Sequence, residues 1–470
     1  MNSTDLAFAT AIEQAKLLRQ KEVSPLELVE LYLRRIEQLN PRLGSYFTVA
    51  AEMAITDARA KTEYLAGNPA DLPPFYGVPI SIKDLNPVAG LPCTFGLQVL
   101  KQRLAKEDDG VVTKIKQAGF VILGKTATSE VGTLPYTEPR GFAPARNPWN
   151  LDYTAGGSSG GAAAAVAAGL CPIAQGSDGG GSVRGPAFCC GLVGIKPSRG
   201  RISMAPAGER LTGMATNGSL GRTVADAAAL LDVMAGYIPG DPYWLPDPQP
   251  SFEAMAGVPP AKLRIAFATN LSPVGEAAPI CRQAVLDTAQ RLEALGHWVE
   301  PDCPNFSELV EPFTIVWQSI LAELGIPFFV LGKMNRWLWS RTLVCSTGQY
   351  MRAVDKLQRI ARQIVAFFEQ VDVLLLPTYM HPTIRIGEWA NLSSAKTLEA
   401  IINWIAPCPP FNASGQPAIA LPTGFAPNGL PIGVQLVGRP AAEATLISLA
   451  AQLEAVNPFY QNRPPMAEEI

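Results

Sequence analysis

The sequence has little histidine, no excess of charge and no hydrophobic run long enough to cross a membrane. It contains two histidines, His297 and His381, and its 38 Lys and Arg nearly balance its 41 Asp and Glu, for a net charge of −3. Without a basic cluster, nucleic-acid binding is not expected. The longest uncharged apolar stretch, residues 161–174, is shorter than the about 20 residues that span a bilayer. We therefore expect no membrane segment.

Cysteine occurs without the spacings that mark a metal site or a disulfide framework. The eight cysteines include no C-x-x-C pair, and zinc needs a cluster of Cys or His ligands. Cys189 and Cys190 stand beside Phe188, where a thiol serves as a small apolar side chain. The N-terminal residues lack the basic and apolar segments of a secretory signal. We expect reduced thiols, a cytoplasmic location and no metal.

Hydrophobic residues make up 48% of the chain and charged residues only 17%, alongside 41 Gly and 42 Pro. This composition indicates a folded body with many tight turns. Patterns typical of strands alternate with patterns typical of helices, which predicts an α/β fold with a mostly buried sheet. Residues 1–70 are predicted to be helical, and Ser24 followed by Pro25 marks a helix start. We expect that helix to end near Gln38, before Pro41.

The remaining elements are predicted from the same patterns. Strands are expected at 78–82, 120–123, 262–268, 371–376, 418–421 and 433–437, and helices at 7–20, 111–117, 161–168, 277–295, 349–370 and 442–454. The aromatic-rich segment 306–339 has helical spacing. Residues 239–260 are rich in proline and give the strongest linker signal in the chain.

Residues 119–126 fit the phosphate-binding pattern G-x-x-x-x-G-K-[ST]. That pattern binds phosphate only where its middle residues form a loop of free amides. Here they are Phe, Val, Ile and Leu, which predict a strand whose amides belong to a sheet. We therefore expect no nucleotide binding.

A glycine-rich segment offers a site for nucleophilic chemistry. Gly179, Gly180 and Gly181 stand directly before Ser182, between apolar segments that place them inside the folded body. Buried glycines permit positive φ and close approach of the backbone to a ligand, so the N–H groups around Ser182 could form an oxyanion hole. The alternative is that these glycines only allow tight packing of a helix on a strand.

A nucleophilic Ser182 would need a base, and neither histidine adjoins a serine or cysteine in a motif, so a Ser-His-Asp mechanism is not favoured. A lysine can serve if burial lowers its pKa. Lys83 follows the predicted strand at 78–82, and ligand clefts form at the carboxyl ends of strands in α/β sheets. The alternative is a lysine that ends the strand in solvent.

At these residues the sequence resembles the amidase signature family. The matching motifs are GVPISIKD (77–84), GKT (124–126), NPW (147–149), GGSSGG (156–161), SDGGGSVR (177–184), GIKPSRGR (194–201) and GLPIGVQ (429–435). The resemblance implies one compact domain over residues 1–470, a large mixed β-sheet covered by helices. N-terminal helices (1–70) would precede a signature core (75–235), a surface excursion (239–260) and a C-terminal part (262–470).

The resemblance also implies roles for individual residues. Lys83, Ser158 and Ser182 would form a Ser–cis-Ser–Lys triad, and the family's spacing between the two serines selects Ser158 over Ser159. The oxyanion hole would comprise Gly179, Gly180, Gly181 and Ser182, and the supporting residues would be Ser159, Asp178 and Arg184. Ser177 stands where many relatives carry threonine.

The implied function is hydrolysis of the C–N bond of a small-molecule carboxylic amide, other than a peptide bond, through an acyl-enzyme and without a cofactor. Residues 177–182, 240–244 and 411–417 look most like 6-aminohexanoate cyclic-dimer hydrolases and nearby bacterial amidases. Two alternatives stay open: a glutaminase-type subunit of a tRNA-dependent amidotransferase, and a non-catalytic binding member of the family. The sequence leaves open the substrate and whether the chain forms a homodimer.

The aromatic side chains of the segment 306–339 are expected to be mainly core. We expect one or two of them to line an apolar acyl pocket, because small-molecule pockets are mostly apolar. The candidates are Phe313, Trp317, Phe328, Phe329, Trp337 and Trp339.

Overall fold

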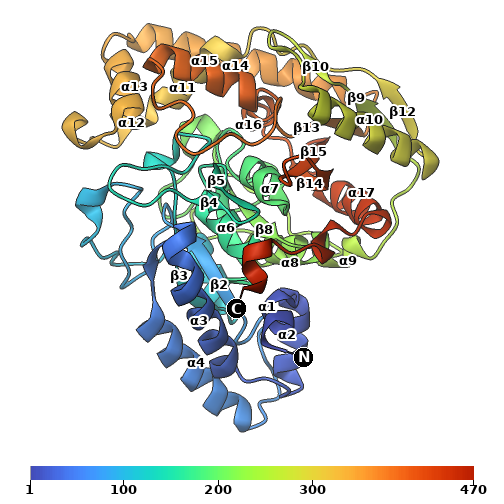
Figure 1. Ribbon diagram of the computed structural model, residues 1–470. Coiled ribbons are helices and arrows are strands. Elements are labelled where there is room, and N and C mark those ends of the chain that lie inside the picture. Colours follow the sequence, from blue (N-terminus) through green and yellow to red (C-terminus); the bar gives the residue numbers. More distant parts are fainter. Residues whose placement is uncertain (1, 470) are drawn as a thin grey trace.

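A computed structural model describes residues 2–469, and its centre is one mixed β-sheet with helices packed around it (Figure 1). Eleven strands of these residues run in the order β1-β3-β2-β6-β8-β7-β14-β15-β13-β9-β12. The pairs β2/β3, β2/β6, β9/β12 and β9/β13 are parallel, and the other neighbours are antiparallel. The predicted α/β class with a large mixed sheet is confirmed.

The strands are β1 (Tyr46–Val49), β2 (Pro79–Lys83), β3 (Val121–Thr126), β4 (Arg146–Asn147), β5 (Asn150–Thr154), β6 (Ile173–Asp178), β7 (Val193–Lys196), β8 (Thr216–Gly221), β9 (Arg264–Phe267), β10 (Asn270–Leu271), β11 (Gly275–Glu276), β12 (Trp298–Pro301), β13 (Val373–Pro377), β14 (Ala418–Phe425) and β15 (Pro431–Gly438).

The α-helices are α1 (Ser3–Phe8), α2 (Ala11–Arg19), α3 (Pro25–Leu43), α4 (Ala51–Ala66), α5 (Gly110–Gln117), α6 (Gly160–Ala167), α7 (Arg184–Cys190), α8 (Val224–Met234), α9 (Phe252–Ala256), α10 (Pro279–Ala294), α11 (Val310–Gln318), α12 (Ile320–Glu323), α13 (Lys333–Leu343), α14 (Thr347–Phe367), α15 (Ser394–Ile405), α16 (Pro409–Ala413) and α17 (Glu443–Val456).

The parallel strands β2 and β6 position the site. They pair through Ser81 with Ala174 and Ile82 with Gln175, so both strands end at the same edge of the sheet. Both are largely buried, and each ends in polar residues, Lys83 on β2 and Asp178 on β6. This edge is where loops that follow parallel strands form ligand clefts.

Helix α6 lies against β2, β6 and β8, and all of its residues are buried. Its sequence is almost entirely glycine and alanine, which lets its backbone approach its neighbours closely. A Cβ at Gly161 would stand only 2.3 Å from the Ala127 nitrogen. The small side chains of this helix therefore set how near the loop before it, which contains Ser158, can come to the sheet.

Two predictions for the N-terminal part are wrong. Tyr46–Val49 form strand β1, which pairs with β3, inside the block predicted to be helical. The strand has only four residues and its partner lies far away in the sequence, so local patterning gave no signal for it. Helix α3 also continues past Pro41 to Leu43. The missing N–H of Pro41 falls in the last turn, and the helix then ends at Gly44, which has φ of 61° and donates its N–H to the Asn40 carbonyl.

The phosphate-loop look-alike is a strand, as predicted: Gly124, Lys125 and Thr126 lie in the buried β3. The Lys125 ammonium is buried and pairs with Asp84 at 2.9 Å.

The segment at 7–20 is two helices, α1 and α2, and not one. In the proline-rich stretch 239–260, the short helix α9 buries Phe252 against its neighbours α8 and α17.

The two ends of the described chain meet. Arg35 on α3 donates to the Ala467 carbonyl at 3.0 Å, and Arg463 pairs with Asp5 at 2.9 Å, next to the helices at the bottom of Figure 1.

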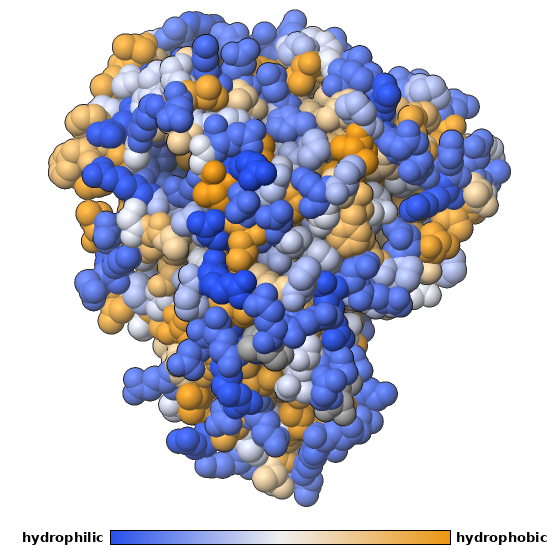
Figure 2. All heavy atoms as spheres, viewed as in Figure 1, coloured by the Kyte–Doolittle hydropathy of each residue, from blue (hydrophilic) through white to orange (hydrophobic). Residues whose placement is uncertain are grey.

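On the face seen in Figure 2, apolar residues are scattered among hydrophilic ones. Among residues 2–469, no helix is both long and apolar enough to span a bilayer. All eight cysteines are free thiols.

Candidate active site

Lys83 ends β2 with its side chain fully buried. Its ammonium nitrogen donates to the Ser158 Oγ at 2.7 Å, to the Ser177 Oγ at 3.0 Å and to the Ser177 carbonyl at 3.3 Å. None of these three acceptors carries a charge. The alternative of a solvent-exposed lysine at the end of the strand is therefore excluded.

The surroundings of Lys83 favour the neutral amine. Burial lowers the pKa of Lys83 to about 7, although the nearby Asp178 carboxylate opposes this shift. An ion pair would have held the pKa near its usual value, and Lys83 forms none among residues 2–469. Near neutral pH the amine can therefore lose its proton and accept another.

Ser158 lies in the turn before α6, and its peptide bond to Gly157 is cis. The backbone here is held on both sides, because the Ser129 N–H donates to the Ser158 carbonyl at 3.3 Å and the Ser159 N–H donates to the Ser182 carbonyl at 3.2 Å. The Ser159 hydroxyl donates to the Ser177 carbonyl at 3.2 Å and does not reach Lys83. Of the two adjacent serines, Ser158 is the one that contacts the lysine.

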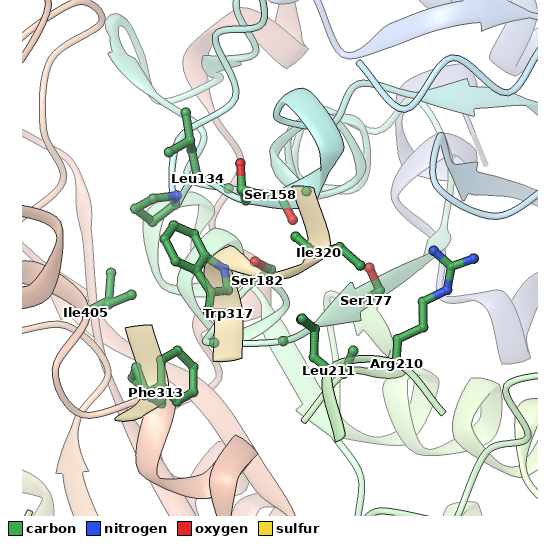
Figure 3. A pocket seen from close by; sticks show the side chains of 18 of the residues that line it. Leu134, Ser158, Ser177, Ser182, Arg210, Leu211, Phe313, Trp317, Ile320 and Ile405 are labelled. Carbon is green, nitrogen blue, oxygen red and sulfur yellow. The ribbon is translucent and has the colours of Figure 1, made fainter. Parts of the chain in front are cut away.

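Ser182 lines a mostly apolar cleft (Figure 3). The cleft has a volume of about 320 Å³, and Ser158, Ser177 and Ser182 all line it. Within residues 2–469, the Ser182 hydroxyl makes no hydrogen bond, and this includes the hydroxyl of Ser158. The Ser182 oxygen is therefore free to meet a ligand in the cleft.

Asp178 and Arg184 form a buried ion pair that shapes the loop around Ser182. The guanidinium of Arg184 holds both carboxylate oxygens, at 2.9 and 3.0 Å. Burial alone would raise the pKa of Asp178, but the Arg184 charge outweighs it and holds that pKa well below its usual range. Asp178 also accepts from the backbone N–H groups of Gly181 and Val183, at 2.7 and 3.1 Å. The pair therefore clamps residues 178–184 in one conformation.

The ion pair of Asp178 and Arg184 also limits which backbone N–H groups could form an oxyanion hole. The Gly181 N–H is occupied by Asp178, so it is not available to a ligand. The N–H groups of Gly179, Gly180 and Ser182 have no acceptor among residues 2–469. Gly181 serves the turn instead: its φ is 117°, and a Cβ there would stand 2.8 Å from the Cys408 Cβ.

Sequence reasoning missed two residues of this site. Ser177 provides two of the three acceptors for the Lys83 ammonium, although the sequence had marked it only as a departure from the family pattern. Asn412 donates to the Asp178 side chain at 2.9 Å and accepts from Arg184 at 2.6 Å. Asn412 stands in the motif 411–417, which was the only signal that the sequence offered. Its contacts with Asp178 and Arg184 join residues that lie almost half the chain apart.

The histidines lie outside the cleft. His297 is buried, accepts the Leu263 N–H at 3.1 Å and pairs with Gln452 at 2.9 Å. His381 stacks on Trp404, and burial lowers its pKa. No group of three or more His, Cys, Asp or Glu side chains in the described part of the chain could hold a metal ion.

Two of the six aromatic candidates line the cleft, Phe313 and Trp317 on α11. Both point toward Ser182 from one side (Figure 3). Phe328 and Phe329 are exposed. Trp337 and Trp339 are half-buried against a separate apolar cluster.

Comparison with known proteins identifies the family. The Amidase family profile matches residues 27–325 and 328–447. The chain belongs to the amidase family. Amidases hydrolyse amides, so this protein is an amide hydrolase, as its sequence motifs predicted.

The similarity of this amidase to known proteins extends over nearly the whole chain. An amidase homologue from Synechocystis sp. is 53% identical over 453 residues, which are 96% of this chain and 89% of that protein. The solved structure of 6-aminohexanoate cyclic dimer hydrolase complexed with substrate has a TM-score of 0.91 and 34% identity, and covers 98% of this chain and 99% of its own. A bacterial aryl acylamidase of the amidase signature family has a TM-score of 0.87 and 25% identity, with coverage of 98% and 99%. The likeness to 6-aminohexanoate cyclic dimer hydrolases is confirmed.

Proposed function

We propose that this amidase hydrolyses a small-molecule carboxylic amide through an acyl-enzyme on Ser182, with Ser158 as proton relay and Lys83 as base. The contact of the Lys83 amine with the Ser158 hydroxyl, in the same cleft as the free Ser182 hydroxyl, carries the proposal. A neutral amine at this position can accept the Ser158 proton across the observed 2.7 Å.

Acylation of Ser182 would proceed through two proton transfers. The neutral Lys83 amine takes the proton of Ser158, which takes the proton of Ser182, while the Ser182 Oγ forms a bond to the amide carbonyl carbon. The C–N bond then breaks, and the proton held on Lys83 returns through Ser158 to the leaving nitrogen. Water adds to the acyl-enzyme by the same relay and releases the carboxylic acid.

The relay needs the two serine hydroxyls to come within hydrogen-bond reach once a substrate is bound. Hydrogen bonds of this kind are often long or absent in unliganded enzymes and shorten in the complex. The negative charge that develops on the carbonyl oxygen would be held by the unpaired N–H groups of Gly179, Gly180 and Ser182. Asp178 and Arg184 act as positioning residues for that loop, and Ser159 for the strand that carries Ser177.

The relatives support a small aliphatic or aryl amide as substrate. One neighbour is a 6-aminohexanoate cyclic dimer hydrolase and another is an aryl acylamidase, and the cleft here is apolar and large enough for a group of that kind. A glutaminase-type subunit of a tRNA-dependent amidotransferase would need a partner for its physiological reaction. A non-catalytic binding protein would show no turnover.

A serine-directed fluorophosphonate tests the nucleophile. We expect one covalent label per chain, which peptide mapping places on Ser182, and no label on Ser182→Ala. The isolated chain should also turn over simple hexanoyl and aryl amides, which separates it from both alternatives. A label on Ser158 or Ser159, or an unlabelled and inactive chain, would overturn the proposal.

A further inference from the structure

The cleft that contains Ser182 has two unlike sides. Its lining is mostly apolar, and among the described residues that line it only Asp109 and Arg210 are charged. Asp109 stands directly before α5, and Arg210 lies in the loop between β7 and β8. Charged groups in a small-molecule cleft commonly fix the orientation of the ligand.

The two sides meet at the glycine loop before Ser182. A Cβ at Gly180 would stand 3.5 Å from the Phe313 ring, whereas a Cβ at Gly179 would stand 4.0 Å from the Leu211 side chain. Leu211 is the neighbour of Arg210 in the chain. In Figure 3, Phe313 lies on one side of Ser182, and Arg210 lies on the other side, beyond Ser177. A ligand at Ser182 therefore has the Phe313 wall at one end and Arg210 at the other.

The two charged side chains differ in the hydrogen bonds that they make within the protein. Asp109 accepts the Val111 N–H at 3.2 Å and an Asn86 N–H at 3.2 Å, and it caps α5, whose N-terminal dipole favours a negative charge. The guanidinium of Arg210 has no hydrogen bond and no ion pair with any residue between 2 and 469. Its charge does act on Asp109: burial raises the pKa of Asp109, and Arg210 opposes that shift without contacting the carboxylate. A half-buried guanidinium with five free donors favours an anionic partner.

The loop that carries Arg210 is held in a constrained conformation. Leu211 and Thr212 have φ of 51° and 55°, a region that L-residues with side chains rarely adopt. Arg199 donates to the Gly213 carbonyl at 2.6 Å and ties this turn to the body of the protein. Strained turns persist where surrounding contacts enforce them, and they are common at ligand sites. The position of Arg210 is therefore set by the fold.

We propose that Arg210 binds a carboxylate of the substrate, so that the preferred substrates are amides that join an apolar acyl group to an amine bearing a carboxylate. The acyl group would lie against Phe313 and Trp317, the scissile carbonyl at Ser182, and the carboxylate at the guanidinium. Arginine suits this role because its planar fork matches a carboxylate with two parallel hydrogen bonds. This inference rests on the proposed function and adds a substrate class to it.

Two substrates that differ only at the far end of the amine test this inference. N-hexanoyl-β-alanine carries a carboxylate where N-propylhexanamide carries a methyl group. We expect the wild-type enzyme to prefer the carboxylate in kcat/KM by about 10- to 100-fold, the range for a hydrogen bond to a charged group. Most of the difference should appear in KM if the contact is the same in the ground and transition states.

Variants at Arg210 separate charge from shape. Arg210→Gln should lose the preference by lowering kcat/KM for the acid, and should leave the neutral amide within about twofold. Arg210→Lys should keep part of the preference, because it retains the charge but not the fork. Arg59→Gln, which removes an exposed arginine on α4, is the control and should change neither value. Activity on the neutral amide shows that each variant is folded.

A second measurement does not depend on turnover. N-hexanoyl-β-alanine should slow the labelling of Ser182 by fluorophosphonate more than N-propylhexanamide does, and Arg210→Gln should abolish that difference. Equal protection and equal kcat/KM for the two compounds, or an equal loss for both in Arg210→Gln, would overturn the Arg210 proposal alone. Failure of Ser182 to react in the wild-type enzyme would overturn the proposed function itself.

Discussion

The Lys83 amine contacts the Ser158 hydroxyl at 2.7 Å and no carboxylate, although Asp84 is the next residue in the chain. Successive side chains leave a strand in opposite directions, and the Asp84 carboxylate pairs instead with Lys125 at 2.9 Å. That buried pair keeps the carboxylate of the neighbouring residue away from the Lys83 amine. Lys83 is left among neutral acceptors, which is the condition for a lowered pKa.

The first prediction concerns the pH dependence of turnover. If Lys83 must be neutral in the free enzyme, log(kcat/KM) should rise with unit slope on the acid side and level off above a pH of about 7, the value to which burial lowers the pKa of Lys83. This apparent value belongs to the coupled Lys83, Ser158 and Ser182. Measuring kcat/KM from pH 5 to 10 on a neutral amide checks it.

Variants of the base give the controls for that profile. Lys83→Ala should remove the acid limb and lower kcat/KM by about 10²- to 10⁴-fold. Lys83→Arg should be nearly as damaging, because a guanidinium keeps its proton. His297→Asn and His381→Asn should keep the limb. If the limb disappears in a histidine variant and persists in Lys83→Ala, the base is a histidine.

The second prediction concerns stability. The pKa of Lys83 is about 7 in the folded protein and 10.5 for an unburied lysine, so between these values the folded state binds fewer protons than the unfolded chain. The contribution of Lys83 to the free energy of unfolding of the wild type should therefore rise with pH across this window, by up to roughly 1.4 kcal/mol per pH unit. Lys83→Met lacks this contribution, so its stability relative to the wild type should fall from pH 7 to pH 10.

Urea unfolding of both proteins at pH 7, 8 and 9 measures this trend. Lys196 is also buried with its pKa lowered to about 7, but it is present in both proteins and cancels in the difference. A difference in stability that stays constant over this range would mean that Lys83 keeps an ordinary pKa in the folded protein.

The third prediction concerns Ser177. Its hydroxyl and carbonyl both accept hydrogen bonds from the Lys83 amine, at 3.0 and 3.3 Å. Ser177→Ala removes the hydroxyl acceptor, which stabilises the charged amine, so the acid limb should move to lower pH and the plateau of kcat/KM should fall by about tenfold. Ser177→Thr retains the hydroxyl and should behave like the wild type. An unshifted limb in Ser177→Ala would show that Ser177 does not position the base.

The fourth prediction concerns the apolar wall. Phe313→Ala and Trp317→Ala enlarge the cleft beside Ser182, so they should shift the preference among acyl chain lengths toward longer chains by about tenfold in relative kcat/KM. Phe329→Ala is the matched control, since that ring is exposed at 68%, and it should leave the preference unchanged. Equal losses of activity for all chain lengths in the wall variants would mean that these rings serve only as core.

Much of this architecture could be predicted from local patterns. The strand that ends at Lys83, the strand at 120–123, the alanine-rich helix before β6 and the two strands β14 and β15 all depend on periodicity that neighbouring positions supply. Strand β1 was not predictable in this way. Its pairing with β3 depends on contacts between distant segments, which local patterning does not contain. The last turn of α3 differs from the prediction for another reason: Pro41 does not end the helix, whereas Gly44 provides the local αL end.

The sequence by itself determined the fold class, the amidase family and the two serines and one lysine on which the proposed chemistry depends. These follow from the hydrophobic patterns and from motifs that can be read locally along the chain. Only the tertiary structure decided how they act together. It placed Lys83 against Ser158 and Ser177, paired Asp84 with Lys125 and occupied the Gly181 N–H with Asp178. It also left Arg210 without a hydrogen bond or ion pair among residues 2–469. Apart from the contact of Gly181 with Asp178, these contacts join residues remote in sequence. Burial and pairing then set the charge and reactivity of each group.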